Sequence, residues 1–372
     1  MRDSAGVRVV ENYEPAWGPG DAWRLSETPT VDIGAAEGDP NYELFGARSS
    51  VRLTDGTIVV ANTGTQELRW YDASGTYLRT IGGKGGGPGE FEGLDRIARL
   101  SGDSIVAYDT ESNRVSVFGP AGGLGRSAPL EGPRGFMEGA FGDGSLLITA
   151  SVTGGLTEGL SRWITRAFRY SNTGQLLDSL GSYAGPEWFT EVRRSGSRIV
   201  GVSSTSRPFA RRASFAVSEG ALYAGTQDSY GIAVYSLEGT LVGGVRRDYA
   251  SLTVTAADIE AYKDRELADV TDAEARPERL RELERLPYPE TMPAYGTIKI
   301  DSEGNLWVAE YRRPGDDQPR WMVFDASHRM LGIVETPRDF TVQQIGTDFV
   351  LGRERDELGV EHLQLYELIK PQ

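Results

Sequence analysis

The chain repeats one short pattern six times, and this repeat constrains the fold more than any other feature. Each copy has a turn with an acidic residue or glycine, a short apolar strand, a polar loop, a second strand with alternating apolar residues, and another turn. The copies start at these residues: Asp55, Gly102, Asp143, Glu219, Glu303 and Gly346. Short strands joined by tight turns are typical of antiparallel hairpins rather than of βαβ units.

An apolar stretch before each first turn supplies a fourth strand. These leading strands read SSVRLT, RIARLS, GAFG, SFAVSE, TIKIDS and VQQIG. Four antiparallel strands repeated about every 43 residues are the signature of β-propeller blades. A blade cannot cover both of its faces, so we expect alternating residues such as Leu68 and Trp70 to pack against a neighbouring blade. The sequence therefore predicts an all-β, single domain over residues 1–372, a six-bladed β-propeller of four-stranded antiparallel blades.

The last copy ends without a fourth strand. Near the start, the segment WRLSETPTVDIGAAEGDPNYELFG resembles the end of a blade, YLRTIGGKGGGPGEFEGLD. We therefore predict that Trp23–Ile33 forms the outer strand of the C-terminal blade. This N-terminal strand would close the ring and leave no open blade edge. The alternative is an N-terminal tail that lies over the surface.

The composition excludes several classes of function. The formal net charge of −15 argues against a nucleic-acid binder, which needs a basic surface. With no Cys and only two His residues, the chain has no disulfide, thiol nucleophile, Cys-based metal site or three-His metal centre. No apolar run approaches the ~20 residues of a transmembrane segment. We expect a monomer.

The stretch IGGKGGGPGEFEGLDRIARL, followed by DSIVAYDTESNRVSVF, resembles the NHL-repeat class of six-bladed propellers. In that class a glycine-rich stretch with Gly-Glu-Phe leads into a strand, the next strand ends in Asp, and an Asn precedes an alternating strand. The matching residues are Gly89, Glu90, Phe91, Asp109 and Asn113. The resemblance runs from Ala47 to Leu368 and is clearest in the first two blades.

The segments DSAGVRVVEN and LPYPETMPAYGTIKIDSEGNLWV are also similar to bacterial six-bladed propellers that are often exported as lipoproteins. This resemblance implies a location in the periplasm or at the cell surface. Without it, the absence of a secretory signal from residues 1–15 would favour the cytoplasm. NHL-like propellers include lyases, hydrolases and recognition modules, so the fold alone does not select a function.

The amidating lyases of this fold class bind zinc through several His residues, whereas this chain has only His328 and His362. We interpret His328 as a turn residue with positive φ and His362 as a residue on the polar side of a strand. We therefore expect no zinc-lyase site and no cofactor. A divalent cation such as calcium is the open alternative.

Long insertions interrupt the repeat at residues 152–161, 182–212 and 247–292, and another long loop covers residues 311–320. In a blade with strands A to D, the B–C loop and the loop to the next blade open on one face, called the upper face below. By this count all four insertions emerge there. Long loops on a rigid scaffold are usually functional or disordered, so we predict that the upper face carries the site.

The insertion 247–292 lies between the fourth and fifth blades and carries two helical patterns. Thr255 followed by Asp258 is a helix N-cap pattern. Pro277 should break or start a helix. We predict a helix pair packed over the mouth of the channel as a lid. The alternative is a charged surface that only faces solvent.

Arginines gather where these loops converge. The second insertion contains Arg193, Arg194, Arg198, Arg207, Arg211 and Arg212. Arg48, Arg96 and Arg134 stand at the starts of leading strands and should point toward the axis. The planar guanidinium suits carboxylate, phosphate or sulfate, so a basic mouth is predicted to bind an anion. The alternative is that each Arg pairs with an acidic neighbour.

The second strands end at an equivalent position around the ring, occupied by Asn62, Asp109, Ser151, Thr226, Glu310 and Arg353. Asp109 and Glu310 are candidate catalytic bases or metal ligands. Alternatively, such residues bond backbone amides of their own loops. Tyr295 could stack on a sugar or an aromatic ligand, or only cover the end of the channel. The candidate ligand-binding residues are Arg48, Arg96, Arg134, Arg212, Tyr295, Arg353 and Asn62.

Three functions fit these features. The first is a ligand-recognition propeller that binds an anionic small molecule, glycan or peptide on the upper face. The second is a lyase or hydrolase that uses Asp109 or Glu310 with Arg96 or Arg353. The third is a scaffold that binds another protein across this face. A closed cluster of carboxylate, Arg and Tyr would favour catalysis, and an open, salt-bridged funnel would favour binding.

Overall fold

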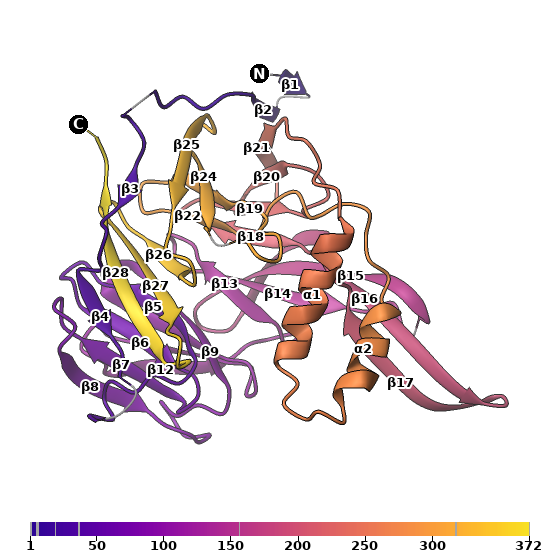
Figure 1. Ribbon diagram of the computed structural model, residues 1–372. Coiled ribbons are helices and arrows are strands. Elements are labelled where there is room, and N and C mark those ends of the chain that lie inside the picture. The colour runs from indigo at the N-terminus through magenta and orange to yellow at the C-terminus, as the bar shows by residue number, and fades with distance from the viewer. Residues whose placement is uncertain are drawn as a thin grey trace.

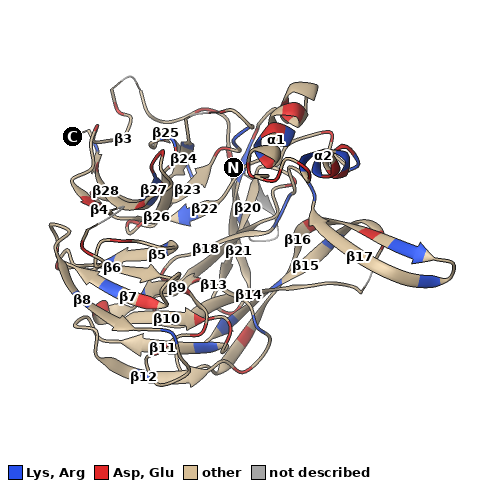
Figure 2. Cartoon of the chain, turned by 60° about the horizontal axis from the view of Figure 1, so that its bottom comes forward, with Lys and Arg blue, Asp and Glu red and all other residues tan. Residues whose placement is uncertain are grey.

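The predicted six-bladed β-propeller is confirmed. The computed structural model describes residues 2–4, 7–18, 20–35, 38–155, 157–316 and 318–371. The strands form six sheets arranged around an axis (Figure 1). Each blade begins with an inner strand, and these strands gather near the centre of the molecule (Figure 2). The inner strands of blades 1 to 5 contact one another in order, and that of blade 6 contacts blade 1.

Blades 1, 2 and 5 keep the simple four-strand plan. Blade 1 consists of β5 (Ala47–Arg52), β6 (Ile58–Asn62), β7 (Glu67–Tyr71) and β8 (Tyr77–Gly82). Blade 2 consists of β9 (Leu94–Arg99), β10 (Ile105–Asp109), β11 (Arg114–Phe118) and β12 (Leu124–Pro129), with a 3₁₀ turn at Ser101–Asp103. Blade 5 consists of β22 (Ile298–Ile300), β23 (Leu306–Ala309), β24 (Arg320–Phe324) and β25 (Met330–Glu335).

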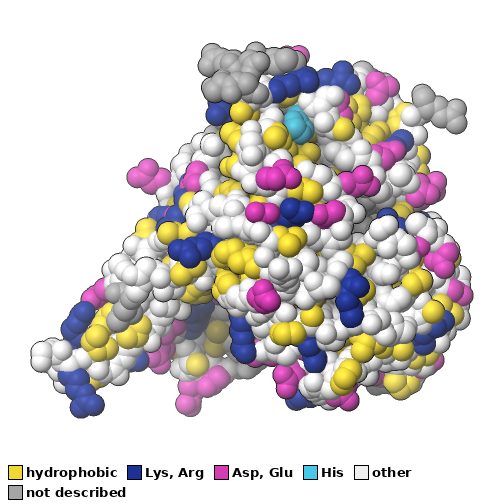
Figure 3. Space-filling view, turned by 180° about the vertical axis from the view of Figure 1, so that it is seen from behind, with side chains coloured by type: hydrophobic (Ala, Val, Ile, Leu, Met, Phe, Trp, Pro, Cys, Tyr) yellow, Lys and Arg dark blue, Asp and Glu magenta, His cyan; other side chains and the backbone are white. Residues whose placement is uncertain are grey.

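Blade 3 extends beyond the ring as a long arm. Its strands are β13 (Phe136–Ala140), β14 (Leu146–Val152), β15 (Gly159–Tyr170), β16 (Leu176–Ser195) and β17 (Arg198–Ser206). The insertion 182–212 is therefore largely strand rather than loop, because residues such as Val192 and Val202 pair across β16 and β17. Hydrophobic side chains line the exposed side of the arm, with basic residues at its tip (Figure 3).

Blade 4 receives an N-terminal strand that the repeat pattern does not predict. Its own strands are β18 (Ser214–Val217), β19 (Ala221–Gly225), β20 (Gly231–Ser236) and β21 (Leu241–Arg247). Strand β2 (Val7–Asn12) pairs in parallel with β21, and β1 (Arg2–Ser4) pairs with β2. Asn12 fixes this strand to blade 5, because its side chain accepts a hydrogen bond from the Met330 amide (2.7 Å) and donates one to the His328 carbonyl (3.0 Å).

Blade 6 closes the ring as predicted. It contains β26 (Thr341–Ile345), β27 (Phe349–Arg355) and β28 (Glu361–Ile369) from the C-terminal region. Two short N-terminal strands, β3 (Arg24–Leu25) and β4 (Val31–Ile33), pair antiparallel with β28. Both lie within the predicted segment Trp23–Ile33. The blade thus combines both ends of the chain, which protects an outer edge that would otherwise be open.

Apolar side chains from neighbouring blades form one buried cluster at each of the six blade interfaces within the described residues. Between blades 1 and 2, for example, Leu68 (0% exposed) and Trp70 (1% exposed) pack with Phe91 and Ile97. This is the contact that the alternating pattern predicts, because a blade buries its faces only against its neighbours.

Local hydrogen bonds explain why the strands turn where they do. In the β5–β6 turn, the Asp55 carboxylate accepts a hydrogen bond from the Thr57 amide (2.9 Å), and Gly56 has a φ of 91°. His328 occupies a similar turn with a φ of 67°, which agrees with its sequence interpretation. These turns require left-handed backbone, which glycine adopts most easily.

The insertion between blades 4 and 5 contains the two predicted helices, α1 (Ala256–Ala268) and α2 (Arg276–Glu284). Thr255 and Asp258 form a capping box at the start of α1. Pro277 lies in the first turn of α2, so it starts this helix rather than breaking it. The helices pack beside the ring, close to the arm (Figure 1).

Candidate functional site

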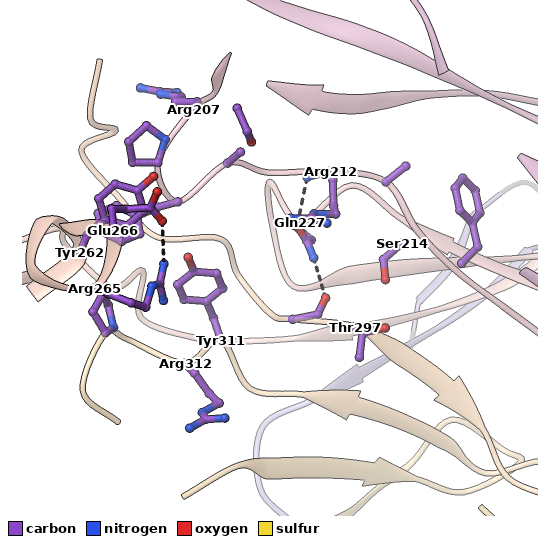
Figure 4. Close-up of a pocket in the computed structure, with 18 of the residues that line it drawn as sticks. Arg207, Arg212, Ser214, Gln227, Tyr262, Arg265, Glu266, Thr297, Tyr311 and Arg312 are labelled. Carbon is purple, nitrogen blue, oxygen red and sulfur yellow. Dashed lines mark hydrogen bonds and ion pairs between the residues drawn. The ribbon is translucent and has the colours of Figure 1, made fainter. Parts of the chain in front are cut away.

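Three segments of the upper face enclose a pocket of about 640 Å³, called the upper pocket below. They are the connection from β17 to β18, helix α1, and the loop between β23 and β24 (Figure 4). The first and second come from the predicted insertions, and the third is the predicted long loop. Three of the four segments expected on one face thus converge at this pocket, and no described residue of 152–161 lines it. The starts of the inner strands β18 and β22 form the floor, with Ser214 and Thr297 exposed to the cavity.

The arginines around this pocket differ in what they bind. Arg207 forms an ion pair with Glu187 (3.1 Å), and Arg211 donates a hydrogen bond to the Thr291 hydroxyl (2.6 Å). The Arg212 side chain is exposed and has neither an ion pair nor a hydrogen bond within the described part of the chain. Its guanidinium is therefore available to a ligand.

The backbone around Arg212 is well held although its side chain is free. Its amide donates to the Gln227 side-chain oxygen (3.0 Å), and the Gln227 side-chain nitrogen donates to the Gly296 carbonyl (Figure 4). Gln227 is 5% exposed and so is itself rigidly packed. The Gln227 side-chain amide thus links the backbone at the start of β18 to the backbone at the start of β22. The site therefore positions the base of the Arg212 side chain before any ligand binds.

Hydroxyl groups add neutral donors to the upper pocket. Ser214, Thr297 and Tyr311 line it, and none of their side chains hydrogen-bonds to another described residue. Burial raises the pKa of Tyr311 to about 12, against the opposing effect of Arg265 and Arg212. The phenol therefore stays protonated at neutral pH and can donate a hydrogen bond.

Helix α1 forms an aromatic wall of the pocket. Tyr262 packs edge-on against Phe209, with ring centroids 5.4 Å apart, and both line the cavity. The helix is held at its start by Asp258, whose carboxylate accepts a hydrogen bond from Arg313 (2.6 Å). Burial disfavours the charge on Asp258, but hydrogen bonds from Thr255 and the contact with Arg313 outweigh it and lower the pKa of this carboxyl. The loop between β23 and β24 and helix α1 are thus joined into one wall.

Of the three arginines expected to point toward the axis, Arg96 lines a narrow cavity between the inner strands, called the axial channel below. It forms an ion pair with Glu138 (3.5 Å). Arg48 pairs with Asp95 (3.6 Å), and Arg134 lies 3.9 Å from Glu111 with both side chains exposed. These three arginines therefore do not form one basic cluster with Arg212.

Asn62 and Asp109 are buried, and their side chains accept backbone amides of adjacent loops. The carboxylate of Asp109, 1% exposed, accepts backbone hydrogen bonds from Glu92 and Gly93 in the preceding loop (2.8 and 3.0 Å). It also accepts the amides of Glu111 and Ser112, at 3.1 and 3.0 Å. The Asn62 side chain accepts the Phe45 amide at 2.7 Å. This arrangement corresponds to the structural alternative weighed for these positions.

The remaining candidates lie outside the upper pocket. Glu310 pairs with Arg320 (3.3 Å), and Arg353 pairs with Glu361 in blade 6 (3.0 Å). Tyr295 is 0% exposed and packs against Tyr230, so its ring is not available to stack on a ligand in this structure. Of the sequence candidates, the structure places Arg212 in the upper pocket.

Sequence reasoning missed Ser214, Thr297 and Tyr311. Ser214 and Thr297 stand at the starts of the leading strands SFAVSE and TIKIDS, the same kind of position that singled out Arg48 and Arg96. A survey of every polar residue at that position would have found them. Tyr311 opens the long loop of residues 311–320, and no local signal distinguishes it from other loop residues.

Comparison with known proteins agrees with the fold. The family model DUF5128, described as a 6-bladed beta-propeller, matches residues 41–123, which cover blade 1 and three strands of blade 2. No curated protein matches the chain.

Solved structures similar to this chain span nearly its whole length. A protein from Bacteroides fragilis described as exported has 12% sequence identity and a TM-score of 0.52, covering 98% of this chain and 100% of its own. A member of the DUF4221 family from Bacteroides vulgatus has 10% identity and a TM-score of 0.51, covering 94% and 99%. At such identities these likenesses show the fold alone.

Two further features bear on function. Within the described ranges, no helix is both long and apolar enough to cross a membrane. In the same part of the chain, no group of three or more His, Asp or Glu side chains is arranged to hold a metal ion. The upper pocket is lined by Arg, hydroxyl and aromatic groups together with the carboxylates of Glu138 and Glu266.

Proposed function

We propose that this propeller is a recognition protein that binds an anionic small molecule, glycan or peptide in the upper pocket, with the acid group of the ligand at Arg212. The observation that carries this proposal is that Arg212 lacks an acidic partner while Arg207 beside it is paired. An unpaired guanidinium beside a cavity offers two parallel donors to a carboxylate, phosphate or sulfate.

The surrounding groups suit a ligand that also carries hydroxyl groups. Ser214, Thr297 and the protonated Tyr311 can exchange hydrogen bonds with such a ligand, while Phe209 and Tyr262 offer apolar surface. Pockets for small ligands typically combine an apolar lining with a few polar groups that fix orientation. Sugar acids, which carry one acid group and several hydroxyls on a compact ring, match this combination.

The experiment compares a sugar acid with its neutral counterpart. Isothermal titration calorimetry with glucuronate and glucose should give binding of the acid and at least tenfold weaker binding of the sugar. Removing a charge-assisted hydrogen bond costs about 1.5–3 kcal/mol, so Arg212→Gln should weaken binding of glucuronate roughly 10- to 100-fold.

Arg193→Gln on the arm is the matched control, because Arg193 is exposed and lies outside the upper pocket. This variant should bind as the unchanged protein does. If a panel of acidic sugars, acyl acids and acidic peptides shows no preference over neutral analogues, or if Arg212→Gln binds equally well, the proposal is wrong.

The lyase or hydrolase alternative finds less support in the geometry. Asp109 uses both carboxylate oxygens to accept backbone amides, and Glu310 is paired with Arg320 outside the pocket. A general base needs an oxygen that reaches the substrate proton. We therefore favour recognition over catalysis by these two carboxylates.

We also propose that the protein acts outside the cytoplasm, as a monomer. The support is the similarity of its fold to the exported protein from Bacteroides fragilis, together with the absence of Cys, which suits an oxidising compartment. Fractionation of cells that carry the native gene should find the protein with the envelope. Recovery in the cytoplasmic fraction would contradict this location, and a dimer in size-exclusion chromatography would contradict the monomer.

A further inference from the structure

Lys299 differs from the other lysines of the chain in where its amine lies. The chain has only four Lys among 39 basic residues. Lys84 is exposed, Lys263 pairs with Glu260 (2.9 Å), and Lys370 pairs with Glu303 and lies over the Trp23 ring. Lys299 instead belongs to the inner strand β22 and lines the axial channel, a cavity of about 270 Å³.

The Lys299 amine has no carboxylate partner. Its Nζ donates a hydrogen bond to the Gln343 carbonyl on the neighbouring inner strand (3.2 Å), and no described acid lies within ion-pair distance. Glu138, the carboxylate that faces the channel, is already held by Arg96 and by the Thr149 hydroxyl (2.8 Å). Lys299 is half-buried, and partial loss of hydration without an ion pair disfavours its ammonium form and favours the neutral amine.

The charges around the amine act in the same direction. Burial and the positive charge of Arg96 lower the pKa of Lys299 to about 8, and Glu138 opposes this shift. The inner strands β18 and β26 contribute no charged side chain, and Arg48 on β5 is paired with Asp95. The lowered pKa makes the neutral amine more abundant at neutral pH than it is in an ordinary lysine. Burial beside another cation is a recognised way to activate a lysine as a nucleophile.

The axial channel adjoins the upper pocket. Glu138, Phe215 and Thr297 line both cavities. Thr297 directly precedes β22, so in an extended strand its side chain points to the same side as that of Lys299, about 7 Å away along the chain. A ligand held at Thr297 therefore lies next to the channel that Lys299 lines.

We propose that Lys299 forms an imine with the carbonyl group of an oxo acid whose carboxylate is bound at Arg212. This inference rests on the proposed function for the position of the acid group. The amine lone pair attacks the carbonyl carbon, a C–N bond forms, and the carbonyl oxygen leaves as water together with the two amine hydrogens. The step consumes no oxidant or reductant, and hydrolysis reverses it. The ligand class is thus narrowed to acids that carry an aldehyde or ketone group.

The test is reductive trapping with glyoxylate, the smallest aldehyde acid, in the presence of cyanoborohydride. The reagent transfers a hydride to the imine carbon and makes the adduct permanent. Peptide mapping by mass spectrometry should find one adduct, on Lys299, formed about tenfold or more faster than any adduct on the exposed Lys84. The rate should rise as pH approaches about 8 and fall at higher pH, because the attack needs the neutral amine and cyanoborohydride reduces the protonated imine. Lys299→Arg should abolish the adduct, and Lys263→Arg should leave it unchanged.

Glycolate, which has the same carboxylate and no carbonyl, separates this inference from the proposed function. If glycolate protects Lys299 and Arg212→Gln slows trapping, the imine proposal and the acid site at Arg212 are both supported. If Lys299 is trapped selectively without either effect, its amine is reactive but the carboxylate of the trapped acid does not bind at Arg212, and the imine proposal as stated is wrong. Equal labelling of Lys84 and Lys299 in the unaltered protein overturns the imine proposal without the need for any variant. Calorimetric binding of glucuronate then still tests the proposed function separately.

Discussion

Ile33 in β4 lies directly opposite Leu363 in β28, although the two residues come from opposite ends of the chain. Both side chains are 0% exposed and belong to one apolar cluster that also includes residues of blade 1. The last blade is therefore completed by the first part of the chain, and the ring closes through apolar burial as well as backbone hydrogen bonds.

The first prediction concerns this closure. Ile33→Ala should lower the free energy of unfolding by about 2–4 kcal/mol, because it leaves a cavity among buried side chains. Urea unfolding followed by tryptophan fluorescence measures the change. Ile199→Ala on the arm removes the same atoms from a side chain that is 46% exposed, and should cost less than about 1 kcal/mol. Equal losses for the two variants would show that the N-terminal strand does not hold the ring.

The second prediction concerns Glu361, which joins blade 6 to blade 1. Its carboxylate accepts the Ala47 amide (2.7 Å) and contacts Arg353 and Arg355. Burial opposes its ionisation, but these partners outweigh burial and lower its pKa below the ordinary 4.5. A lowered pKa contributes stability above the ordinary value, and this contribution is lost as pH falls through the folded value.

Glu361→Gln should therefore destabilise the protein by about 1–3 kcal/mol at pH 7, since buried donors lose a charged acceptor. The difference in unfolding free energy between the two proteins should shrink as the pH falls below about 4.5. Urea titrations at a series of pH values measure it. A difference that stays constant down to pH 3 would contradict the role of the charge.

The third prediction separates stability from binding at Asp109. Asp109→Asn places an amide group among backbone donors and should cost about 1–3 kcal/mol of stability. Because Asp109 lies outside the upper pocket, glucuronate affinity should stay within about twofold at a temperature where the variant is folded. Glu310→Gln, which breaks a partly exposed ion pair, should cost less than about 1 kcal/mol. If the Asp109→Asn variant folds but no longer binds glucuronate, Asp109 belongs to the binding site.

The fourth prediction concerns helix α1 as a wall of the pocket. Thr255→Ala removes the N-cap and should destabilise the helix by about 0.5–2 kcal/mol. Hydrogen exchange should become faster for amides of α1 and stay unchanged in the inner strands. Glucuronate affinity should fall, because Tyr262 and Arg265 come from this helix. Faster exchange with unchanged affinity would show that α1 is not part of the binding wall. Thr173→Ala, in a turn of blade 3, is the control.

The blades, their number and their closure could be predicted because the signals are local. A strand is recognised by alternating apolar residues such as Leu68 and Trp70, and a turn by residues such as Asp55 and Gly56. The capping box at Thr255 and the helix start at Pro277 were visible for the same reason. The parallel pairing of β2 with β21 could not be predicted, because the sequence of one short strand does not indicate which strand it pairs with.

Predicting the candidate site required the tertiary structure far more than predicting the blades did. The sequence shows that arginines are concentrated in the insertion 182–212. It does not show that Arg207 forms an ion pair with Glu187 while Arg212 forms none with a described acidic residue. It also contains Lys299 in an ordinary leading strand, with nothing to show that Arg96 and Glu138 face it across the axis. Secondary structure follows from neighbours along the chain. Ion pairing, burial and pKa depend on distances between segments far apart in sequence, and only the closed ring sets those distances.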